Sequence, residues 1–292
     1  MFQGFDTKRL RVNGTEINLR TGGDGPPLLL IHGYPQTHVM WHKIAPALAE
    51  NFTVVCPDVR GYGDSEKPPA SAPLDAFCKR TAARDLVEVM GLLGHESFSL
   101  AGHDRGARVA YRLALDHPAR TQKLAVLDIV PTVEQYERMR VSGAQASYHW
   151  YFLAQPAPLP ERLIGNDPEF YLRHSIESWA ATPDCFDDAA MAEYIRCFSD
   201  PDTIRATCED YRAGYAIDRK LDAADREAGR KITCPLLALW GDRGKPEKSV
   251  AVLDIWRNWA TDATGHGVPG GHFLPEEAPA ETLQAFREFF GP

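Results

Sequence analysis

The stretch Gly102-His103-Asp104-Arg105-Gly106 decides how this sequence is interpreted. An apolar run at 98–101 precedes it, and a helical pattern that begins at Ala107 follows it. Small residues two positions before and after a central nucleophile, between a strand and a helix, indicate the sharp turn known as a nucleophile elbow. Glycine suits such a turn because a Cβ would obstruct its close backbone contacts. The motif therefore predicts that Asp104 projects above the end of a strand.

Asp104 also permits a simpler interpretation, because aspartate is a favoured residue at the N-cap of a helix. In that case the side chain would have a structural role only. As a nucleophile, a carboxylate would perform different chemistry from the serine hydroxyl that more often occupies an elbow. The motifs elsewhere in the chain bear on this choice.

The composition is that of an ordinary globular protein, with 292 residues, 44% hydrophobic and 25% charged. The net charge of −8 and the lack of a Lys/Arg-rich run argue against a nucleic-acid partner. No stretch approaches the roughly 20 apolar residues of a membrane span, and the first residues do not resemble a signal peptide. The six cysteines are scattered without a CxxC spacing, which predicts free thiols in a reducing cytoplasm and no metal site.

Apolar segments that alternate with helical patterns predict βαβ units and a mostly parallel sheet. The expected buried strands are 28–31, 52–56, 98–101, 123–129 and 235–241. Residues 74–93 are expected to form one of the connecting helices. The sequence thus predicts an α/β class with a central sheet flanked by helices.

The alternation of strands and helices stops between residues 132 and 224, where helical and Pro-rich segments dominate. An all-helical insertion after a strand end predicts a cap over the carboxyl edge of the sheet, where open α/β sheets bind ligands. We therefore expect residues 1–131 and 225–292 to form the core and residues 132–224 to form the cap.

Five motifs spread along the chain together resemble the α/β-hydrolases over nearly its whole length. They are an HGxP loop (32–35), a D-x-R-G-x-G-x-S loop (58–65), the elbow (102–106), W-G-D (240–242) and a late G-G-H (270–272). Aspartate at the elbow resembles the branch that contains haloalkane dehalogenases, epoxide hydrolases and haloacetate dehalogenases. The run His-Asp-Arg-Gly-Ala-Arg (103–108), with His149-Trp150 in the cap, is similar to the fluoroacetate and haloacetate dehalogenases, whereas the other two groups usually carry Trp directly after the nucleophile. Tyr34 departs from this pattern, because the fluoroacetate enzymes tend to have Phe there, and this bears on pocket polarity.

The chemistry expected of such a site begins with Asp104. A carboxylate can displace halide from Cα of a 2-haloacid and form an ester that water can cleave, whereas serine would leave a stable ether. His272, late in the chain after Gly270-Gly271, would activate that water and so release glycolate. The resemblance places the triad acid at Asp128, and Asp242 is the alternative position used by epoxide hydrolases.

Two arginines on the elbow helix are expected to bind the carboxylate of the substrate. Arg105 and Arg108 are three residues apart, so both can face the pocket, and arginine pairs well with carboxylates. Arg108 alone would be interpreted as an exposed helix residue. The backbone N–H groups of Arg105 and Tyr34 are expected to stabilise the oxyanion of the ester-cleavage step.

The resemblance also implies a halide site made of N–H and O–H donors in the cap. It assigns His149, Trp150 and a tyrosine to this role, for which Tyr211 is our choice and Tyr215 the fallback. Trp179 is expected either to line the pocket or to contribute packing alone. No cofactor is implied, and the expected partner is a small haloacid.

Two rival functions remain at this stage. An epoxide hydrolase would use the same Asp–His machinery with two cap tyrosines, from Tyr148, Tyr151, Tyr211 and Tyr215, although an epoxide offers the two arginines no carboxylate. A receptor on a hydrolase fold would bind without turnover and would not need the Asp–Asp–His set. The sequence leaves open the preference among fluoride, chloride and bromide and the tolerance of substituted 2-haloacids, and the resemblance suggests a homodimer.

Overall fold

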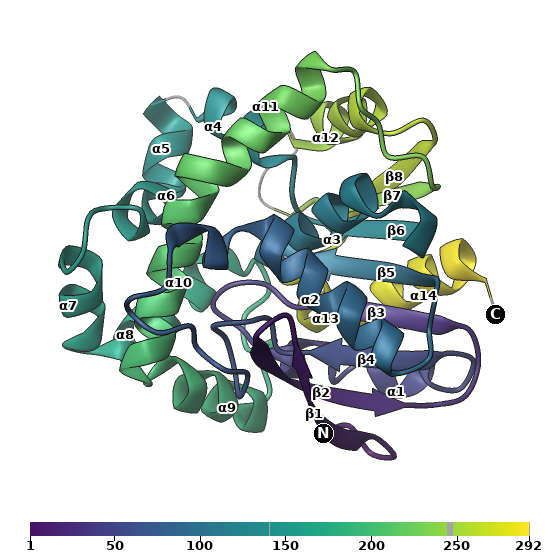
Figure 1. Cartoon of the computed structure of the whole chain (residues 1–292), viewed down its shortest axis with the longest axis horizontal. Helices are drawn as coiled ribbons and strands as arrows, with labels where there is room; N and C mark the ends of the chain where they lie inside the picture. Colours follow the sequence, from purple (N-terminus) through teal and green to yellow (C-terminus); the bar gives the residue numbers. More distant parts are fainter. Residues whose placement is uncertain (140, 244–247, 292) are drawn as a thin grey trace.

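The computed structural model describes residues 1–139, 141–243 and 248–291, and their strands form one twisted sheet (Figure 1). The strand order is β1-β2-β4-β3-β5-β6-β7-β8. The first pairings, β1 with β2 and β2 with β4, are antiparallel, and every later pairing is parallel. The bounds are Asp6–Val12 (β1), Thr15–Gly22 (β2), Pro27–Ile31 (β3), Thr53–Pro57 (β4), Phe98–His103 (β5), Thr121–Leu127 (β6), Leu236–Gly241 (β7) and Ala263–Val268 (β8). The predicted α/β class is confirmed.

Strand β3 and its neighbour β5 form the centre of the core. Every side chain from Leu28 to Ile31 is fully buried, as is expected where helices cover both faces of a parallel sheet. At the sheet edge, β1 and β2 are joined by Asn13-Gly14, whose φ angles of 42° and 76° fit the type I′ hairpin turn that this dipeptide favours.

Helices cover the two faces of the sheet (Figure 1). On one face lie α2 (Lys79–Leu92) and α3 (Asp104–Asp116), and on the other lie α1 (Ala45–Leu48) and α14 (Pro279–Phe290). The core also contains η1 (His38–Trp41), η2 (Leu74–Phe77), η3 (Pro118–Arg120), α12 (Lys248–Trp259) and α13 (Leu274–Glu277). The single helix predicted over 74–93 is interrupted, because Cys78 is extended (φ −74°, ψ 157°) and α2 begins only at Lys79.

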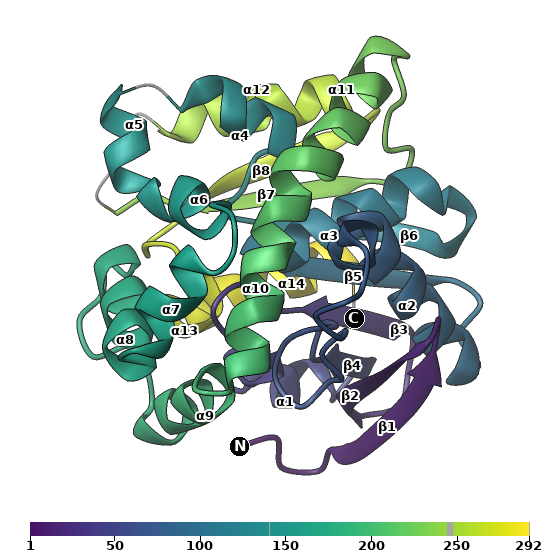
Figure 2. The same ribbon diagram turned by 60° about the vertical axis from the view of Figure 1, so that its left-hand side comes forward.

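The chain between β6 and β7 is helical. It contains α4 (Thr132–Arg138), α5 (Val141–Ala146), α6 (Tyr148–Leu153), α7 (Leu159–Gly165), α8 (Pro168–Trp179), α9 (Asp188–Phe198), α10 (Pro201–Ala213), a π-helical turn η4 (Gly214–Asp218) and α11 (Arg219–Glu227). Figure 2 shows α10 and α11 following one another as a long helical rod. Helix α11 extends past residue 224, to Glu227. The cap boundaries expected from the sequence, 132 and 224, stay a prediction.

A buried acid joins this helical region to the core. Glu276 of α13 accepts a hydrogen bond from the hydroxyl of Tyr194 in α9, 3.0 Å away, and another from the side-chain amide of Gln36. Burial raises the pKa of Glu276 to about 8, although these two hydrogen bonds act in the opposite direction. The folded state therefore favours the protonated acid up to mildly alkaline pH.

This raised pKa predicts that stability falls as the pH rises from mildly acidic to about 8. An unfolded glutamate has a pKa of about 4.3, so between that pH and about 8 the folded chain binds the extra proton. The contribution of Glu276 to stability is therefore complete below about pH 4.3 and is lost as the pH rises to about 8. The loss is up to about 1.4 kcal/mol per pH unit. We expect Glu276→Gln to flatten this part of the pH profile in urea unfolding.

The matched control for this prediction is Glu281→Gln, an exposed carboxyl in the first turn of α14. It should leave the wild-type slope unchanged. If Glu276→Gln kept the wild-type slope as well, the acid would not titrate in this range.

Candidate active site

Asp104 lies at the turn between β5 and α3 and is held there by a close approach of the backbone. Its φ of +46° is rare for a residue with a side chain and is typical of strained functional positions. A Cβ on Gly106 would lie 2.1 Å from the carbonyl oxygen of His32, so only glycine fits. The backbone N–H of Tyr34 donates to Asp104 Oδ1 at 3.0 Å. The elbow thus presents a 7%-exposed carboxylate beside the loop that follows β3.

His272 approaches this carboxylate from the loop that follows β8. Its Nε2 lies 3.8 Å from Asp104 Oδ2, and its Nδ1 lies 2.6 Å from Asp128 Oδ2. Asp128 follows β6 with a φ of +53° and also accepts the backbone N–H of Gly241 at 3.2 Å. The ring of His272 therefore lies between the carboxylates of Asp104 and Asp128. Asp242, the alternative acid, is exposed.

The His272 loop is held by two backbone contacts. Its N–H donates to the carbonyl of Trp179 at 3.2 Å, and its carbonyl accepts the ring N–H of His103 at 2.7 Å. Burial, together with the neighbouring His272, lowers the pKa of His103 to about 4, so His103 is neutral and serves as this donor. Residues of the elbow and of α8 therefore fix the backbone of the expected base.

The geometry predicts which of the two candidate acids supports His272. Asp128→Asn should reduce kcat by about 10³–10⁴-fold, because the amide would favour the wrong tautomer of the histidine. The measurement is turnover, by each variant, of the 2-haloacid that the sequence leads us to expect as substrate. The control is Asp242→Asn, which should retain activity within about threefold; the reverse result would assign the role to Asp242.

Charges around Asp104 keep it ionised. Burial alone would raise its pKa, but His272 and other neighbouring groups, among them Arg108 and Arg105, outweigh burial and lower it. A buried carboxylate is otherwise costly unless it is paired. The nucleophile expected from the sequence is therefore an anion at neutral pH.

Both arginines of the elbow helix are buried, at 3% (Arg105) and 2% (Arg108) exposure, so the interpretation of Arg108 as an exposed helix residue is wrong. Arg105 donates from Nε and Nη2 to Asp210, and Arg108 donates from Nη1 to the carbonyl of Val130 at 2.9 Å. Arg105 Nη1 and Arg108 Nε have no hydrogen-bond partner among the described residues. Each arginine is thus held at one end and has an unused N–H at another atom.

The aromatic residues expected at the halide site form one cluster over these arginines. The ring of Tyr211 lies 6.0 Å from that of His149 and 5.8 Å from that of Trp150. The guanidinium carbon of Arg105 lies 4.1 Å from the centre of the Tyr211 ring, and that of Arg108 lies 4.5 Å from Trp150. Burial lowers the pKa of His149 to about 3, so it is neutral and retains one N–H.

Trp179 and Tyr34 border the same cluster, and Tyr215 does not. The ring of Trp179 lies 4.4 Å from His149 and 5.8 Å from His272, and Tyr34 lies 5.2 Å from Tyr211. Tyr215 is 49% exposed. Of the two candidate tyrosines, the structure therefore places Tyr211 beside the other expected residues.

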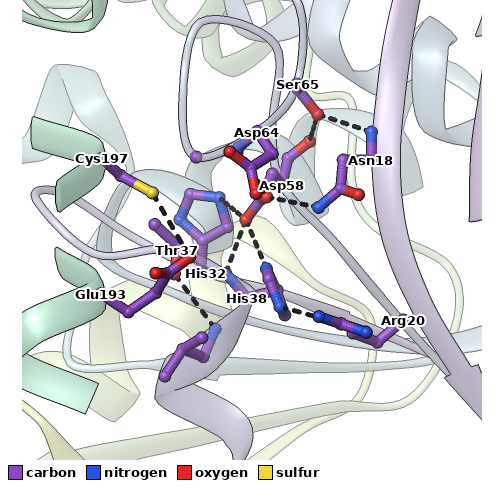
Figure 3. Close-up of polar contacts among 12 residues, drawn as sticks. Asn18, Arg20, His32, Thr37, His38, Asp58, Asp64, Ser65, Glu193 and Cys197 are labelled. Carbon is purple, nitrogen blue, oxygen red and sulfur yellow. Dashed lines mark hydrogen bonds and ion pairs between the residues drawn. The ribbon is translucent and has the colours of Figure 1, made fainter. Parts of the chain in front are cut away.

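A second buried Asp–His pair, centred on Asp58, braces the loop that carries Tyr34. Asp58 accepts hydrogen bonds from the side chain of Asn18, from the backbone and ring of His38, and from the backbone of Asp64 (Figure 3). Burial would raise the pKa of Asp58, but the histidines beside it outweigh burial and lower it. Because its oxygens are occupied by these donors, we assign Asp58 a structural role.

Asp210 is a further residue of the site that the sequence did not reveal. It contacts Arg105 directly, and Lys79 and Tyr62 contact Asp210. These residues are far apart in the chain and form no motif, so the only available signal was the position of Asp210 next to Tyr211. In the described part of the chain, no group of three or more His, Cys, Asp or Glu side chains could hold a metal ion, and none of the helices has the length and apolar character of a membrane span.

Comparisons with known proteins agree with this geometry. A family model described as the alpha/beta hydrolase fold matches residues 26–279. The chain is 43% identical to a fluoroacetate dehalogenase from Burkholderia sp., over 99% of this chain and 95% of that protein. It is 34% identical to a soluble epoxide hydrolase from Corynebacterium sp. (strain C12), with 96% of each covered. A structure from Nostoc sp. PCC 7120 described as an alpha/beta hydrolase is 55% identical, covers 99% of each chain and superposes with a TM-score of 0.96.

Proposed function

Because the chain belongs to the α/β-hydrolase family, we propose that it is a dehalogenase that hydrolyses haloacetates to glycolate and halide. The relative that is a fluoroacetate dehalogenase supports this assignment. The observation that carries it is the pair of buried arginines beside an ionised Asp104. A carboxylate substrate would accept hydrogen bonds from Arg105 Nη1 and Arg108 Nε, which have no partner among the described residues.

In the first step, Asp104 attacks Cα of the haloacetate. One carboxylate oxygen forms the new C–O bond while the carbon–halogen bond breaks, and its electron pair leaves with the halide. The substrate carboxylate would be bound by Arg105 Nη1 and Arg108 Nε, the nitrogens without a partner among the described residues. His149, Trp150 and Tyr211 would donate hydrogen bonds to the departing halide, whose charge develops in the transition state.

In the second step, water cleaves the ester on Asp104. His272 accepts a proton from the water, which attacks the carbonyl carbon of Asp104, and the Asp128 carboxylate stabilises the charged imidazole through the 2.6 Å contact. The backbone N–H of Tyr34, which is 3.0 Å from Asp104 Oδ1, would stabilise the oxyanion together with the backbone N–H of Arg105. The bond between the carbonyl carbon of Asp104 and the glycolate oxygen then breaks, and His272 returns its proton to that oxygen. Asp104 loses the second proton of the water to solvent, which restores its free carboxylate.

The first experiment is halide release from fluoroacetate and chloroacetate, with styrene oxide tested in parallel. The proposal requires halide from at least one acid, and replacing Asp104 with alanine should abolish it. Diol from the epoxide without halide from either acid would reassign the chain to epoxide hydrolysis. Epoxide hydrolysis is the alternative because the Corynebacterium relative is a soluble epoxide hydrolase. An epoxide, however, offers no carboxylate to Arg105 and Arg108.

The two-step route predicts a trapped ester in His272→Asn. Without a base, the first step should proceed once and the second should stall. We expect a burst of about one halide per chain, together with a mass increase of one carboxymethyl group on Asp104, as measured by mass spectrometry. Asp104→Ala is the control and should show neither signal. Steady turnover by His272→Asn would contradict the role of the histidine.

The halide site predicts a difference between fluoride and chloride. Tyr211→Phe keeps the ring over Arg105 but removes the hydroxyl, and fluoride is the poorer leaving group. Fluoride release should therefore fall by about tenfold or more and chloride release by less than about threefold. Tyr215→Phe, on the exposed fallback residue, should change neither rate. Equal losses for the two halides would remove Tyr211 from the halide site.

Three broader assignments complete the proposal. The small-molecule substrate follows from the activity itself. A homodimer is proposed from the family resemblance, and a cytoplasmic location from the six scattered cysteines, all of which are free thiols. Sedimentation analysis of the purified chain would test the homodimer.

A further inference from the structure

Arg105 is held by an acid from the cap rather than being free to meet a substrate with its whole guanidinium. Asp210 of α10 accepts Nε of Arg105 at 2.7 Å with its side chain and Nη2 at 2.7 Å with its backbone carbonyl. A Cβ on Gly214, in the next turn, would lie 3.0 Å from Nη2. The guanidinium is therefore confined between Asp210, Gly214 and the ring of Tyr211, and Nη1 is the nitrogen left without a partner among the described residues.

This arrangement raises an electrostatic problem. A tight pair of Arg105 and Asp210 has no net charge, so it would attract an anionic substrate only weakly. The substrate carboxylate must also approach Asp104, which is itself an anion. Like charges in a buried site repel strongly because the local dielectric is low.

Lys79 supplies the missing positive charge. Burial and Arg105 lower the pKa of its ammonium group, whereas its carboxylate partners Asp210 and Asp218 act in the opposite direction. Its ammonium group forms an ion pair with Asp210 on the side away from Arg105, since Lys79 contacts Oδ1 and Arg105 contacts Oδ2. Lys79 is 3% exposed, and the hydroxyl of Tyr62 donates to the same carboxylate at 3.0 Å. Asp210 is thus saturated by donors, and Arg105 and Lys79 lower its pKa to about 2 even though burial would raise it.

A third acid, Asp218 of the π-helical turn, balances Lys79 in turn. Its Oδ1 accepts the backbone N–H of Lys79 at 2.9 Å, and its Oδ2 lies 4.0 Å from the ammonium nitrogen. Burial raises the pKa of Asp218 to about 6, so it is ionised in mildly alkaline solution. Asp218 does not contact Arg105 through any hydrogen bond or ion pair among the described residues.

We propose that Asp210 and Lys79 are positioning residues for the carboxylate site: Asp210 orients Arg105, and Lys79 offsets the charge of Asp210 so that Arg105 still attracts an anion. This inference rests on the proposed dehalogenase function and extends it. Three cations (Arg105, Arg108, Lys79) face three carboxylates (Asp104, Asp210, Asp218) in one buried cluster. Without Lys79, two cations would face three carboxylates, and the substrate would enter a negatively charged site.

The test is a series of variants that changes this charge balance one unit at a time. Chloroacetate kinetics and competitive inhibition by acetate, which binds without chemistry, are measured at about pH 8 for Lys79→Met, Asp218→Asn and the double variant. We expect Lys79→Met to raise KM and the inhibition constant about tenfold or more while kcat stays within about threefold. Asp218→Asn should lower both constants, and the double variant, in which charge balance is restored, should return them to within about threefold of the wild type.

The control is Arg80→Met, which removes the neighbouring positive charge. Arg80 is half-exposed and pairs with Asp116 at 2.7 Å, away from the cluster. It should change KM by less than about twofold. Thermal unfolding of every variant separates loss of structure from loss of affinity; if Lys79→Met does not fold, Asp218→Asn and the double variant carry the test.

Each outcome has a distinct meaning. If the wild type releases halide but the acetate inhibition constant does not change across the series, the inference is wrong and the dehalogenase function stands. The same holds if the double variant remains as weak as Lys79→Met, because Lys79 would then act only on structure. If the wild type releases no halide from any haloacetate, the proposed function itself fails.

Discussion

The structure depends on keeping an ionised carboxylate buried at the end of β5. An isolated anion in that position would cost several kcal/mol or would take up a proton. The backbone N–H of Tyr34 and the charges of His272, Arg108 and Arg105 offset that cost, and the elbow holds Asp104 with a positive φ where these groups can reach it. The cations that stabilise the nucleophile are also those that a carboxylate substrate needs. The Asp104 carboxylate and the substrate carboxylate are therefore stabilised by the same positively charged side chains.

The partners of these positively charged side chains couple the cap to the core. The nucleophile and both arginines belong to the core helix α3, but the acid that orients Arg105 and the ring that covers it belong to α10. Moving α10 away from the core would break the ion pairs of Asp210 with Arg105 and with Lys79 at once. The position of the cap and the electrostatics of the site are therefore set by the same contacts.

The sequence predicted those parts of the site whose signals are local. The five residues of the elbow pointed to Asp104, and the spacing of Arg105 and Arg108 in the run 103–108 pointed to both arginines. The triad acid stayed open because Asp128 and Asp242 follow the adjacent parallel strands β6 and β7 and so reach the same edge of the sheet. Lys79 and Asp210 could not be predicted, since 131 residues separate them and the helix expected over 74–93 concealed the helix start at Lys79.

Tyr211 and Tyr215 illustrate how backbone detail escapes a periodicity argument. Residues four apart share a face of an α-helix, so either tyrosine fits the expected halide site. The π-helical turn that begins at Gly214 breaks this periodicity, and Tyr211 is buried while Tyr215 is exposed. Single π turns are frequent at functional sites. Here the same turn also places Asp218 against Lys79 and Gly214 against Arg105.

The burial of Tyr211 also bears on the choice between the two reactions that an Asp–His–Asp set supports. Burial and the neighbouring Asp104 raise the pKa of Tyr211 well above its ordinary value, although Arg105 acts in the opposite direction. Such a hydroxyl donates a hydrogen bond but gives up its proton reluctantly. A halide leaves as a stable anion and needs only hydrogen bonds, whereas the alkoxide formed when an epoxide opens must receive a proton. A protonated tyrosine held against the guanidinium of Arg105 can donate to a leaving halide, and the buried pair of Arg105 and Arg108 favours a haloacid over an epoxide.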